Sequence, residues 1–285
     1  MLEGEPSQTA LHVAAARAAH RRYDPPPHLL EDDRAEALLG EKALDLISIY
    51  ADGGSWVLAE NRLFIPFRAR YAEDRLAAAY RDGVRQLVVL GAGLDSYAFR
   101  RPAEQSALRV FEVDHPSTQR WKLQRIEALG WSIPDSVSFV PCDFETASVS
   151  EVLRDTASFV ADEPAIVTWL GVVYYLTPDT ARQALVDLSA LLVPGSEVIL
   201  DYQFPMEDLP PRYAELAAKM ASYLEKVGEP QHNRYRPEAL REVIRAAGYA
   251  GALLPSRSEI HARYFAPLDS KIPMSERFGM AVAQR

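Results

Sequence analysis

The chain has 285 residues, of which 48% are hydrophobic and 25% charged, with a formal net charge of −9. This composition is ordinary for a soluble globular protein, and the acidic balance argues against a nucleic-acid partner or an anionic membrane. The single cysteine, Cys142, excludes an internal disulfide and a cysteine-based zinc site, and we expect it to be a small buried residue. No apolar run reaches the roughly 20 residues that span a bilayer. The N-terminus lacks the pattern of a signal peptide, so we expect a cytoplasmic protein.

Residues 1–83 are predicted to form a helical extension packed on the core. Helices are expected over 8–24, 32–50 and 67–82. The first stops before a run of three prolines, the second starts in an acidic N-cap region at Asp32, and the third ends at Gly83.

Residues 84–285 are predicted to form an α/β domain. Strands are expected over 86–90, 109–113, 137–141, 164–169 and 197–202, with helices between them over about 117–129, 147–158 and 179–192. Alternation of this kind predicts a parallel sheet with helices on both faces. A helix over 237–247 and two late strands near 249–254 and 277–283 would complete the sheet as an antiparallel pair.

Residues 205–237 interrupt this rhythm and are predicted to form a lid over the carboxyl ends of the strands. A helix is expected over about 210–227, followed by a polar loop over 228–235. Insertions of this kind commonly shape a pocket and exclude water from it. The apolar side chains expected to wall the pocket are Met206, Leu209, Leu216, Met220, Tyr223 and Leu224.

A glycine-rich turn follows the first predicted strand. Gly91-Ala92-Gly93 comes directly after 86–90, and the next strand ends at Asp114. A strand, a glycine turn, a second strand and an acid form the layout of a nucleotide-binding βαβ unit. Ser96 replaces the third glycine of the dinucleotide pattern, and Asp95 stands where a phosphate would come. The turn therefore favours an adenosine ligand without phosphates, such as S-adenosyl-L-methionine (SAM).

Ligands of open α/β sheets bind at the carboxyl ends of the strands, so the residues that follow each strand are candidates. Asp114 suits the ribose hydroxyls, Asp143 the adenine amino group and Phe144 the adenine ring face. Tyr174 and Tyr175 lie beyond the fourth strand and Tyr202 ends the fifth.

Through these residues, the chain resembles the bacterial SAM-dependent methyltransferases of the leucine carboxyl methyltransferase superfamily. The matching segments are Thr9-Ala10, Arg17-Ala18, Arg68-Ala69-Arg70 with Asp74, Leu90 to Ser96 with Arg100, Glu112 to Pro116 with Lys122, Asp143, and Gly171 to Leu176. The resemblance implies a class I methyltransferase fold, a Rossmann-like, seven-stranded, mostly parallel sheet. It also implies SAM as the cofactor. The chain departs from the family at Leu170, where a glutamate is usual.

The resemblance implies roles for particular residues. An arginine pairs with the methionine carboxylate of SAM, with Arg68 as first choice and Arg70 as the alternate. The cofactor-binding set is expected to be Arg68, Arg70, Gly91, Ala92, Gly93, Asp95, Asp114, His115, Asp143, Phe144, Leu170 and Gly171. Substrate contacts are expected from Tyr174, Tyr202, Arg234 and Tyr235, and catalytic roles from His115, His232 and Tyr175.

The expected reaction is O-methylation of a carboxyl or hydroxyl group of a small molecule, in specialised metabolism. A carboxylate acceptor is already ionised, whereas a hydroxyl needs a base such as His115 or His232. The alternatives are methylation of a protein C-terminal carboxyl, a nicotinamide-dependent oxidoreductase and a non-catalytic SAM-binding protein. The six histidines show no metal-ligand spacing, so no metal is expected. A homodimer is left open.

Overall fold

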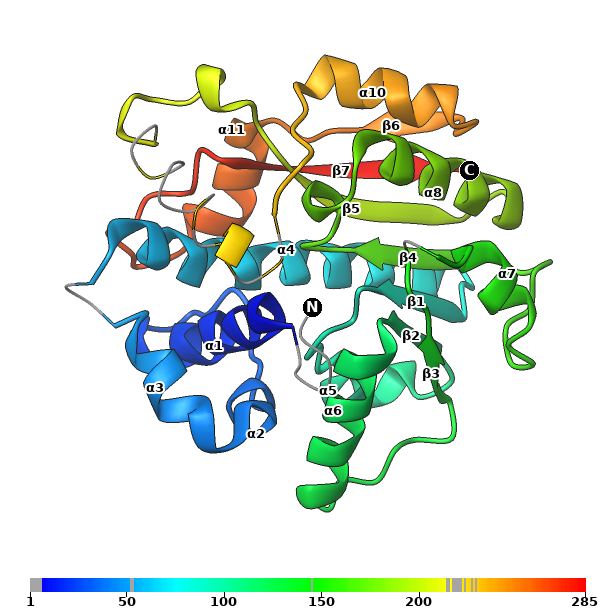
Figure 1. Ribbon diagram of the computed structural model, residues 1–285, viewed down its shortest axis with the longest axis horizontal. Coiled ribbons are helices and arrows are strands. Elements are labelled where there is room, and N and C mark those ends of the chain that lie inside the picture. The colour runs from blue at the N-terminus through cyan, green and yellow to red at the C-terminus, as the bar shows by residue number, and fades with distance from the viewer. Residues whose placement is uncertain are drawn as a thin grey trace.

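The computed structural model describes residues 7–51, 54–144, 146–213, 216, 222, 224–226, 228 and 230–285 (Figure 1). Its centre is a seven-stranded sheet in the order β3-β2-β1-β4-β5-β7-β6. The strands are β1 (Gln86–Leu90), β2 (Arg109–Asp114), β3 (Val137–Pro141), β4 (Ala165–Trp169), β5 (Glu197–Gln203), β6 (Gly251–Leu253) and β7 (Phe278–Gln284). Strands β1 to β5 pair in parallel, and β7 runs antiparallel to both β5 and β6. The predicted sheet, including its antiparallel pair, is confirmed.

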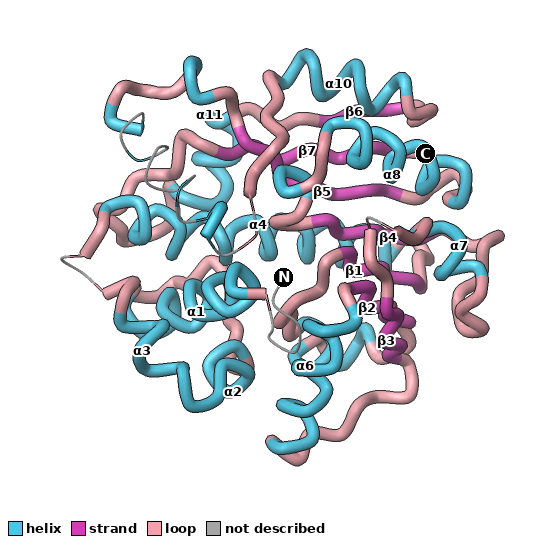
Figure 2. Tube along the Cα trace, viewed as in Figure 1, coloured by secondary structure: helices cyan, strands magenta, loops and turns pink. Residues whose placement is uncertain are grey.

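The sheet is covered by helices on both faces, as its apolar strands require. All five residues of β1 are buried. Leu87 and Val89 belong to one buried cluster and Val88 and Leu90 to the other, which is the alternation of a strand between two packed layers. Figures 1 and 2 show α8 (Pro178–Leu191) and α10 (Pro237–Ala246) in front of the sheet and α4 (Trp56–Arg81) behind it.

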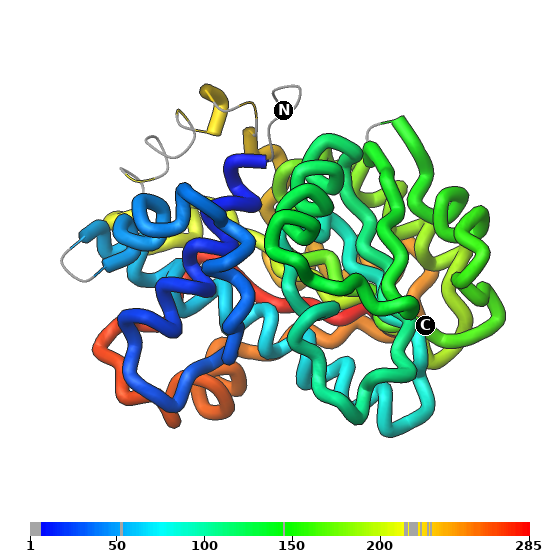
Figure 3. The backbone as a smooth tube through the Cα atoms, turned by 90° about the horizontal axis from the view of Figure 1, so that it is seen from below, coloured from blue at the N-terminus to red at the C-terminus, as the bar shows by residue number. Residues whose placement is uncertain are grey.

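The N-terminal helices gather at one end of the molecule (Figure 3). They are α1 (Gln8–Tyr23), α2 (Ala35–Leu39) and α3 (Ala43–Ser48), joined to the sheet by α4. Leu11 of α1, Leu63 of α4 and Val89 of β1 belong to the same buried cluster, so these helices and the sheet share a core. The boundary expected near residue 83 stays a prediction.

The single helix expected over 32–50 is wrong. Helix α2 ends at Leu39, and Gly40 follows with φ of 66°, which breaks the helical path before α3 begins. The acidic start is nevertheless real, because the Asp32 carboxylate accepts hydrogen bonds from the backbone N–H groups of Arg34 and Ala35, at 3.1 and 3.0 Å.

Helix α4 begins at Trp56, eleven residues before the expected start at 67, and it continues through Pro66. A proline inside a helix removes one backbone hydrogen bond and costs stability, so the sequence suggested a boundary there. Here packing outweighs that cost, because Leu63, Phe64 and Phe67 on either side of the proline are all buried.

The remaining elements follow the expected order with shifted ends. Helix α6 covers Pro116–Ala128, and α7 is only Val149–Arg154 instead of 147–158. Two short helices, α5 (Tyr97–Arg100) and α11 (Arg257–Ile260), were not expected. Half of the helix expected over 210–227 lies outside the described residues, including Met220 and Tyr223.

Candidate active site

A cavity of about 520 Å³ lies at the carboxyl ends of β1 to β4. Helices α1 and α4 close it from the side, through residues such as Ala10, Arg17 and Arg68. In Figure 1 the β4 arrow points toward this side, where α1 lies. Its volume is within the usual range for a site that holds a small molecule.

The glycine turn after β1 forms one wall of the cavity. Gly91 and Gly93 have φ of 64° and 50°, a left-handed backbone that favours glycine. A Cβ on Gly91 would stand 2.3 Å from Cγ2 of Val172, so a side chain there would collide with the loop after β4. The N–H groups of Gly91 and Ala92 both donate to the carbonyl of Val113, at 2.8 and 3.2 Å, which ties the turn to β2.

Asp114 ends β2 and lines the cavity. Its carboxylate accepts hydrogen bonds from the backbone N–H of Gly93 and from that of His115, the latter at 2.6 Å. Burial raises the pKa of Asp114 above its usual range. A carboxylate offers about four lone-pair positions, so two remain for further donors. That capacity fits the two hydroxyls of a ribose.

His115 is the N-cap of α6, and its Nδ1 accepts the Ser117 N–H at 3.2 Å. In neutral imidazole the proton must then sit on Nε2, an assignment that follows from this hydrogen bond. His115 lines the cavity, so it can donate to a ligand through Nε2. It is poorly suited to act as a general base, because its acceptor nitrogen is already engaged.

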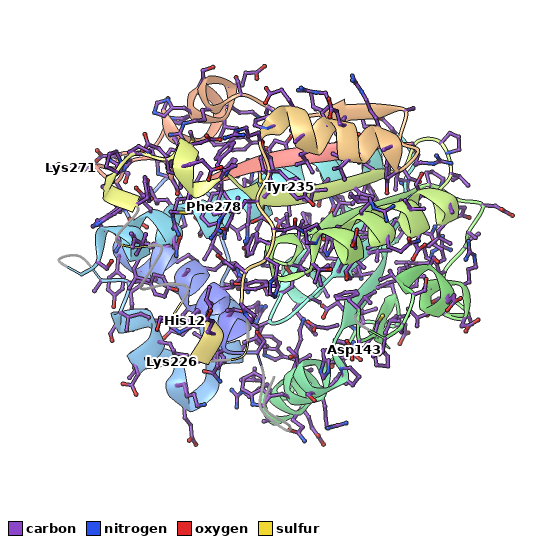
Figure 4. All side chains as sticks on the ribbon, turned by 45° about the horizontal axis from the view of Figure 1, so that its top comes forward. His12, Asp143, Lys226, Tyr235, Lys271 and Phe278 are labelled. Atoms are coloured by element: carbon purple, nitrogen blue, oxygen red, sulfur yellow. The ribbon has the colours of Figure 1, made fainter. Side chains whose placement is uncertain are left out.

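Asp143 and Phe144 follow β3 and line the same cavity together with the buried Cys142. They extend it along the sheet on the side of β3. Figure 4 shows Asp143 far from Tyr235, a residue that we expected to touch the substrate.

Arg68 lines the opposite end of the cavity, on α4. Its side chain is 5% exposed, and its Nη1 donates to Oδ2 of Asp201 at 2.8 Å and to the Tyr174 hydroxyl at 3.1 Å. Burial alone would lower the pKa of Arg68, but Asp201 and Tyr174 together outweigh burial and raise it, so the guanidinium stays charged. The other nitrogens of the fork remain available to an anion.

Asp201, on β5, is a residue that sequence analysis missed. Its carboxylate is fully buried and also accepts the Gly171 N–H at 2.6 Å. It therefore links Arg68 to the turn after β4, beside Leu170. A single acidic residue inside an apolar strand gave no motif, although a charge in the predicted strand 197–202 was a signal of a buried partner.

Arg17, Asp32 and Ser96 form a second buried group that sequence analysis missed. Arg17 Nε donates to Asp32 at 2.7 Å, Arg17 Nη2 donates to the Leu94 carbonyl at 2.6 Å, and the Ser96 hydroxyl donates to Asp32 at 2.7 Å. Burial opposes ionisation of Asp32, but Arg17 and Arg100 outweigh it and lower the pKa of Asp32 to about 2. Ser96, which replaces the third glycine, thus fastens the glycine turn to the N-terminal helices.

A third buried pair joins Glu112 of β2 to Lys122 of α6 below the cavity, and each side chain is 1% exposed. Burial raises the pKa of Glu112 to about 7, against the opposing charge of Lys122.

The structure separates the other predicted site residues into two groups. Tyr174, Tyr175, His232, Asp95, Leu170 and Gly171 line the cavity with the residues above. The residues Arg70, Tyr202, Arg234 and Tyr235 do not belong to its described lining.

Each residue of the second group has a different setting. Arg70 is half exposed and pairs with Asp74 at 2.7 Å. Tyr202 lines a separate cavity, and Arg234 is exposed. The Tyr235 N–H donates to the Gln203 carbonyl at 2.9 Å, and its ring packs on the core. Residues two apart on a helix point to different sides, so Arg68 and Arg70 cannot both face the cavity. The sequence does not show which side of the helix faces the cavity, so spacing alone could not choose between them.

In the part of the chain that the structure describes, no three acidic, histidine or cysteine side chains are grouped so that they could hold a metal ion. None of the described helices is both long and apolar enough to cross a membrane.

The family model for leucine carboxyl methyltransferase matches residues 10–189, which contain most of α1, the glycine turn, Asp114 and β4. The chain belongs to the leucine carboxyl methyltransferase family. YktD of Bacillus subtilis, named as a SAM-dependent methyltransferase, is 31% identical over 273 residues, which cover 87% of this chain and 88% of YktD. A relative of the same description from Mycolicibacterium smegmatis is 33% identical over 76% of this chain and 74% of its own length.

Solved structures confirm the class I methyltransferase fold of this family member. A protein from Thermobifida fusca described as a methyltransferase superimposes with a TM-score of 0.57 at 15% identity, covering 99% of this chain and 96% of that one. A DUF574 family protein from Streptomyces avermitilis also gives 0.57, at 16% identity, over 95% of this chain and 97% of its own.

The leucine carboxyl methyltransferase relatives establish the chain as a SAM-dependent methyltransferase, with SAM as its cofactor. The nicotinamide-dependent alternative is therefore dropped. The cavity fits the cofactor chemically, with spare acceptor capacity at Asp114, a charged fork at Arg68 and a glycine cradle between them.

Proposed function

We propose that this methyltransferase transfers the methyl group of SAM to a carboxylate oxygen of a small molecule. A hydroxyl acceptor and a protein C-terminal carboxylate remain the competing proposals. The role in specialised metabolism stays a prediction.

The observation that supports a carboxylate acceptor most strongly is the state of His115. Its Nδ1 accepts a backbone N–H, so it is a helix cap and a poor base. A carboxylate is ionised near neutral pH and needs no base, whereas a hydroxyl acceptor would need one. His232, the other histidine on the described lining, is exposed and would have to serve a hydroxyl acceptor alone.

We assign the cofactor side from the positions of its residues on the cavity lining. Asp114 is proposed for the ribose hydroxyls, Asp143 for the adenine amino group and Phe144 for the adenine face. Arg68 is proposed for the methionine carboxylate, with Asp201 holding the guanidinium in position. Such a bidentate fork is well suited to a carboxylate.

The acceptor side is proposed to be the wall formed by Tyr175, Leu176 and His232. When bound, SAM supplies an electrophilic methyl group on a sulfonium. The protein's contribution is to hold the acceptor oxygen in line with that methyl and to exclude water. The backbone N–H of His232 donates to the Tyr174 carbonyl at 2.7 Å, which fixes this part of the insertion beside the loop after β4.

The test uses SAM tritiated in its methyl group and a bacterial extract separated into small molecules and proteins. Methyl esters release labelled methanol in alkali, whereas methyl ethers do not. We expect alkali-releasable label in the small-molecule fraction, and much less of it at limiting SAM with an Asp114→Ala variant. Alkali-stable label would instead contradict a carboxylate acceptor, and alkali-releasable label confined to the protein fraction would establish protein carboxyl methylation.

A further inference from the structure

A second cavity, of about 360 Å³, lies between α4, α11 and the ends of β5 and β7. We call it the aromatic cavity, because five rings line it. They are those of Phe64, Phe67, Tyr202, Phe204 and Phe278. Figure 4 shows Phe278 on the upper part of the molecule, away from Asp143 of the cofactor side.

The size and the apolar lining of the aromatic cavity leave room for an apolar ligand. Protein interiors are close-packed, and voids larger than a water molecule are few. Apolar cavities of roughly 150 Å³ stay dry and take up benzene. The two serines on the lining have hydrogen bonds of their own, since the Ser256 hydroxyl bonds to Glu259 at 2.7 Å and Ser275 accepts the Arg277 N–H at 3.4 Å. An apolar guest therefore suits this space better than water.

A positive charge stands where the aromatic cavity meets solvent. Arg257 lines the cavity and is exposed. Its Nη1 donates to the Ser275 carbonyl at 2.7 Å and its Nη2 to the Met274 carbonyl at 3.3 Å, which holds the guanidinium at the rim. A guanidinium has five N–H groups, so further donors can meet an anion. The nearby Glu259 carboxylate is engaged in the capping box of α11.

We propose that the aromatic cavity binds a small molecule with an apolar chain or ring and a carboxylate head, the head lying at Arg257. In the described part of the chain, no residue lines both cavities. The Tyr174 and Phe278 rings, with centroids 6.1 Å apart, stand between them. The aromatic cavity is thus a ligand site apart from methyl transfer, and this inference does not depend on the proposed acceptor.

The primary test is calorimetric titration of the full chain with decanoate, with and without saturating S-adenosylhomocysteine. Decanoate should bind in both conditions, because the two sites are separate. If S-adenosylhomocysteine abolishes the decanoate signal, decanoate occupies the cofactor cavity and the proposal is wrong. Absence of binding in both conditions would also overturn it.

Two pairs of variants locate the site. Leu254→Trp fills the cavity, since Leu254 lines it, whereas Leu253→Trp changes the exposed neighbour, which does not. We expect decanoate affinity to fall by at least about tenfold in the first variant and to stay unchanged in the second. Equal affinity in both variants would contradict the location.

The second pair tests the charge. Arg257→Gln should weaken decanoate by about tenfold and leave 1-decanol unaffected, whereas Arg263→Gln, on the next exposed arginine, should change neither. Unchanged decanoate binding in Arg257→Gln would remove the carboxylate head from the proposal. Thermal melting of each variant checks that the fold is retained.

Discussion

The charged residues on the cofactor side of the active-site cavity and those of the insertion over 205–237 are held differently. On the cofactor side, Arg17 and Asp32 are paired with side chains 6% and 0% exposed, and Arg68 and Asp201 with 5% and 0%. On the insertion side, Arg236 pairs with Asp208 at 2.6 Å, but the two side chains are 57% and 36% exposed.

This difference indicates a division of labour. Buried ion pairs hold side chains of the cavity wall in one geometry before a ligand binds. Less side-chain entropy is then lost on binding. Exposed ion pairs are screened by solvent, so they contribute little to fixing the position of their side chains. We propose that the cofactor side is built for one ligand, whereas the insertion adapts to the acceptor.

The largest expected effect is on stability. Asp32→Asn leaves Arg17 buried without its counter-charge, and we expect the free energy of unfolding to fall by about 3–5 kcal/mol. Asp208→Asn, which breaks the exposed pair, should leave the denaturation midpoint almost unchanged. Urea unfolding of both variants measures the contrast, and similar losses in the two would contradict it.

The next effect is on cofactor affinity. Asp114→Ala should weaken SAM binding by about 1.5–3 kcal/mol, the usual cost of losing hydrogen bonds to a charged group. Arg234→Ala, on the insertion side, should leave SAM binding unchanged. Isothermal titration of the two folded variants with SAM measures both affinities. Wild-type affinity in Asp114→Ala would contradict the assignment of Asp114 to the ribose.

The pH dependence sharpens the comparison further. The folded state lowers the pKa of Asp32 to about 2 from 3.8, so its stabilising contribution is present above the unfolded value and is lost as pH falls toward 2. The stability gap between the wild type and Asp32→Asn should therefore shrink by about 2 kcal/mol between about pH 5 and pH 2. Unfolding curves at both pH values measure this gap. A gap that does not change with pH would mean that Asp32 is not held ionised by its neighbours.

The smallest effect concerns the acceptor. His232 lines the cavity, whereas Arg234 is exposed and does not belong to its described lining. His232→Ala should raise the acceptor KM several-fold with little change in SAM affinity, and Arg234→Ala should change neither. Steady-state kinetics with the acceptor found in the tritium experiment measure both. A raised KM in Arg234→Ala alone would restore the role that the sequence suggested for Arg234.

The sequence predicted well the sheet and the loops that line the cavity, because both depend on local patterns. Gly91 and Gly93 adopt a left-handed backbone that favours glycine, and Asp114 ends a buried strand. Each feature can therefore be recognised from a few neighbouring residues in the sequence. The resemblance to a known family then identified the cofactor.

Long-range pairing is what the sequence could not provide. Asp201 meets Arg68 across 133 residues and Asp32 meets Ser96 across 64, and no short motif records either contact. The start of α4 at Trp56 was not predicted for a similar reason, since tertiary packing around Pro66 outweighs a local helix-breaking signal. Tyr202 and Tyr235 were assigned by their place after β5, although the direction of each side chain depends on packing.

The most direct test of the cofactor side compares two ligands in two variants. S-adenosylhomocysteine has the methionine carboxylate and methylthioadenosine lacks it, so their affinity ratio reports the carboxylate contact alone. Arg68→Lys cannot reproduce a bidentate fork, and it should weaken S-adenosylhomocysteine by about tenfold while methylthioadenosine binds as before. Arg70→Lys should change neither affinity. Loss of S-adenosylhomocysteine affinity in Arg70→Lys, with Arg68→Lys unaffected, would contradict the account.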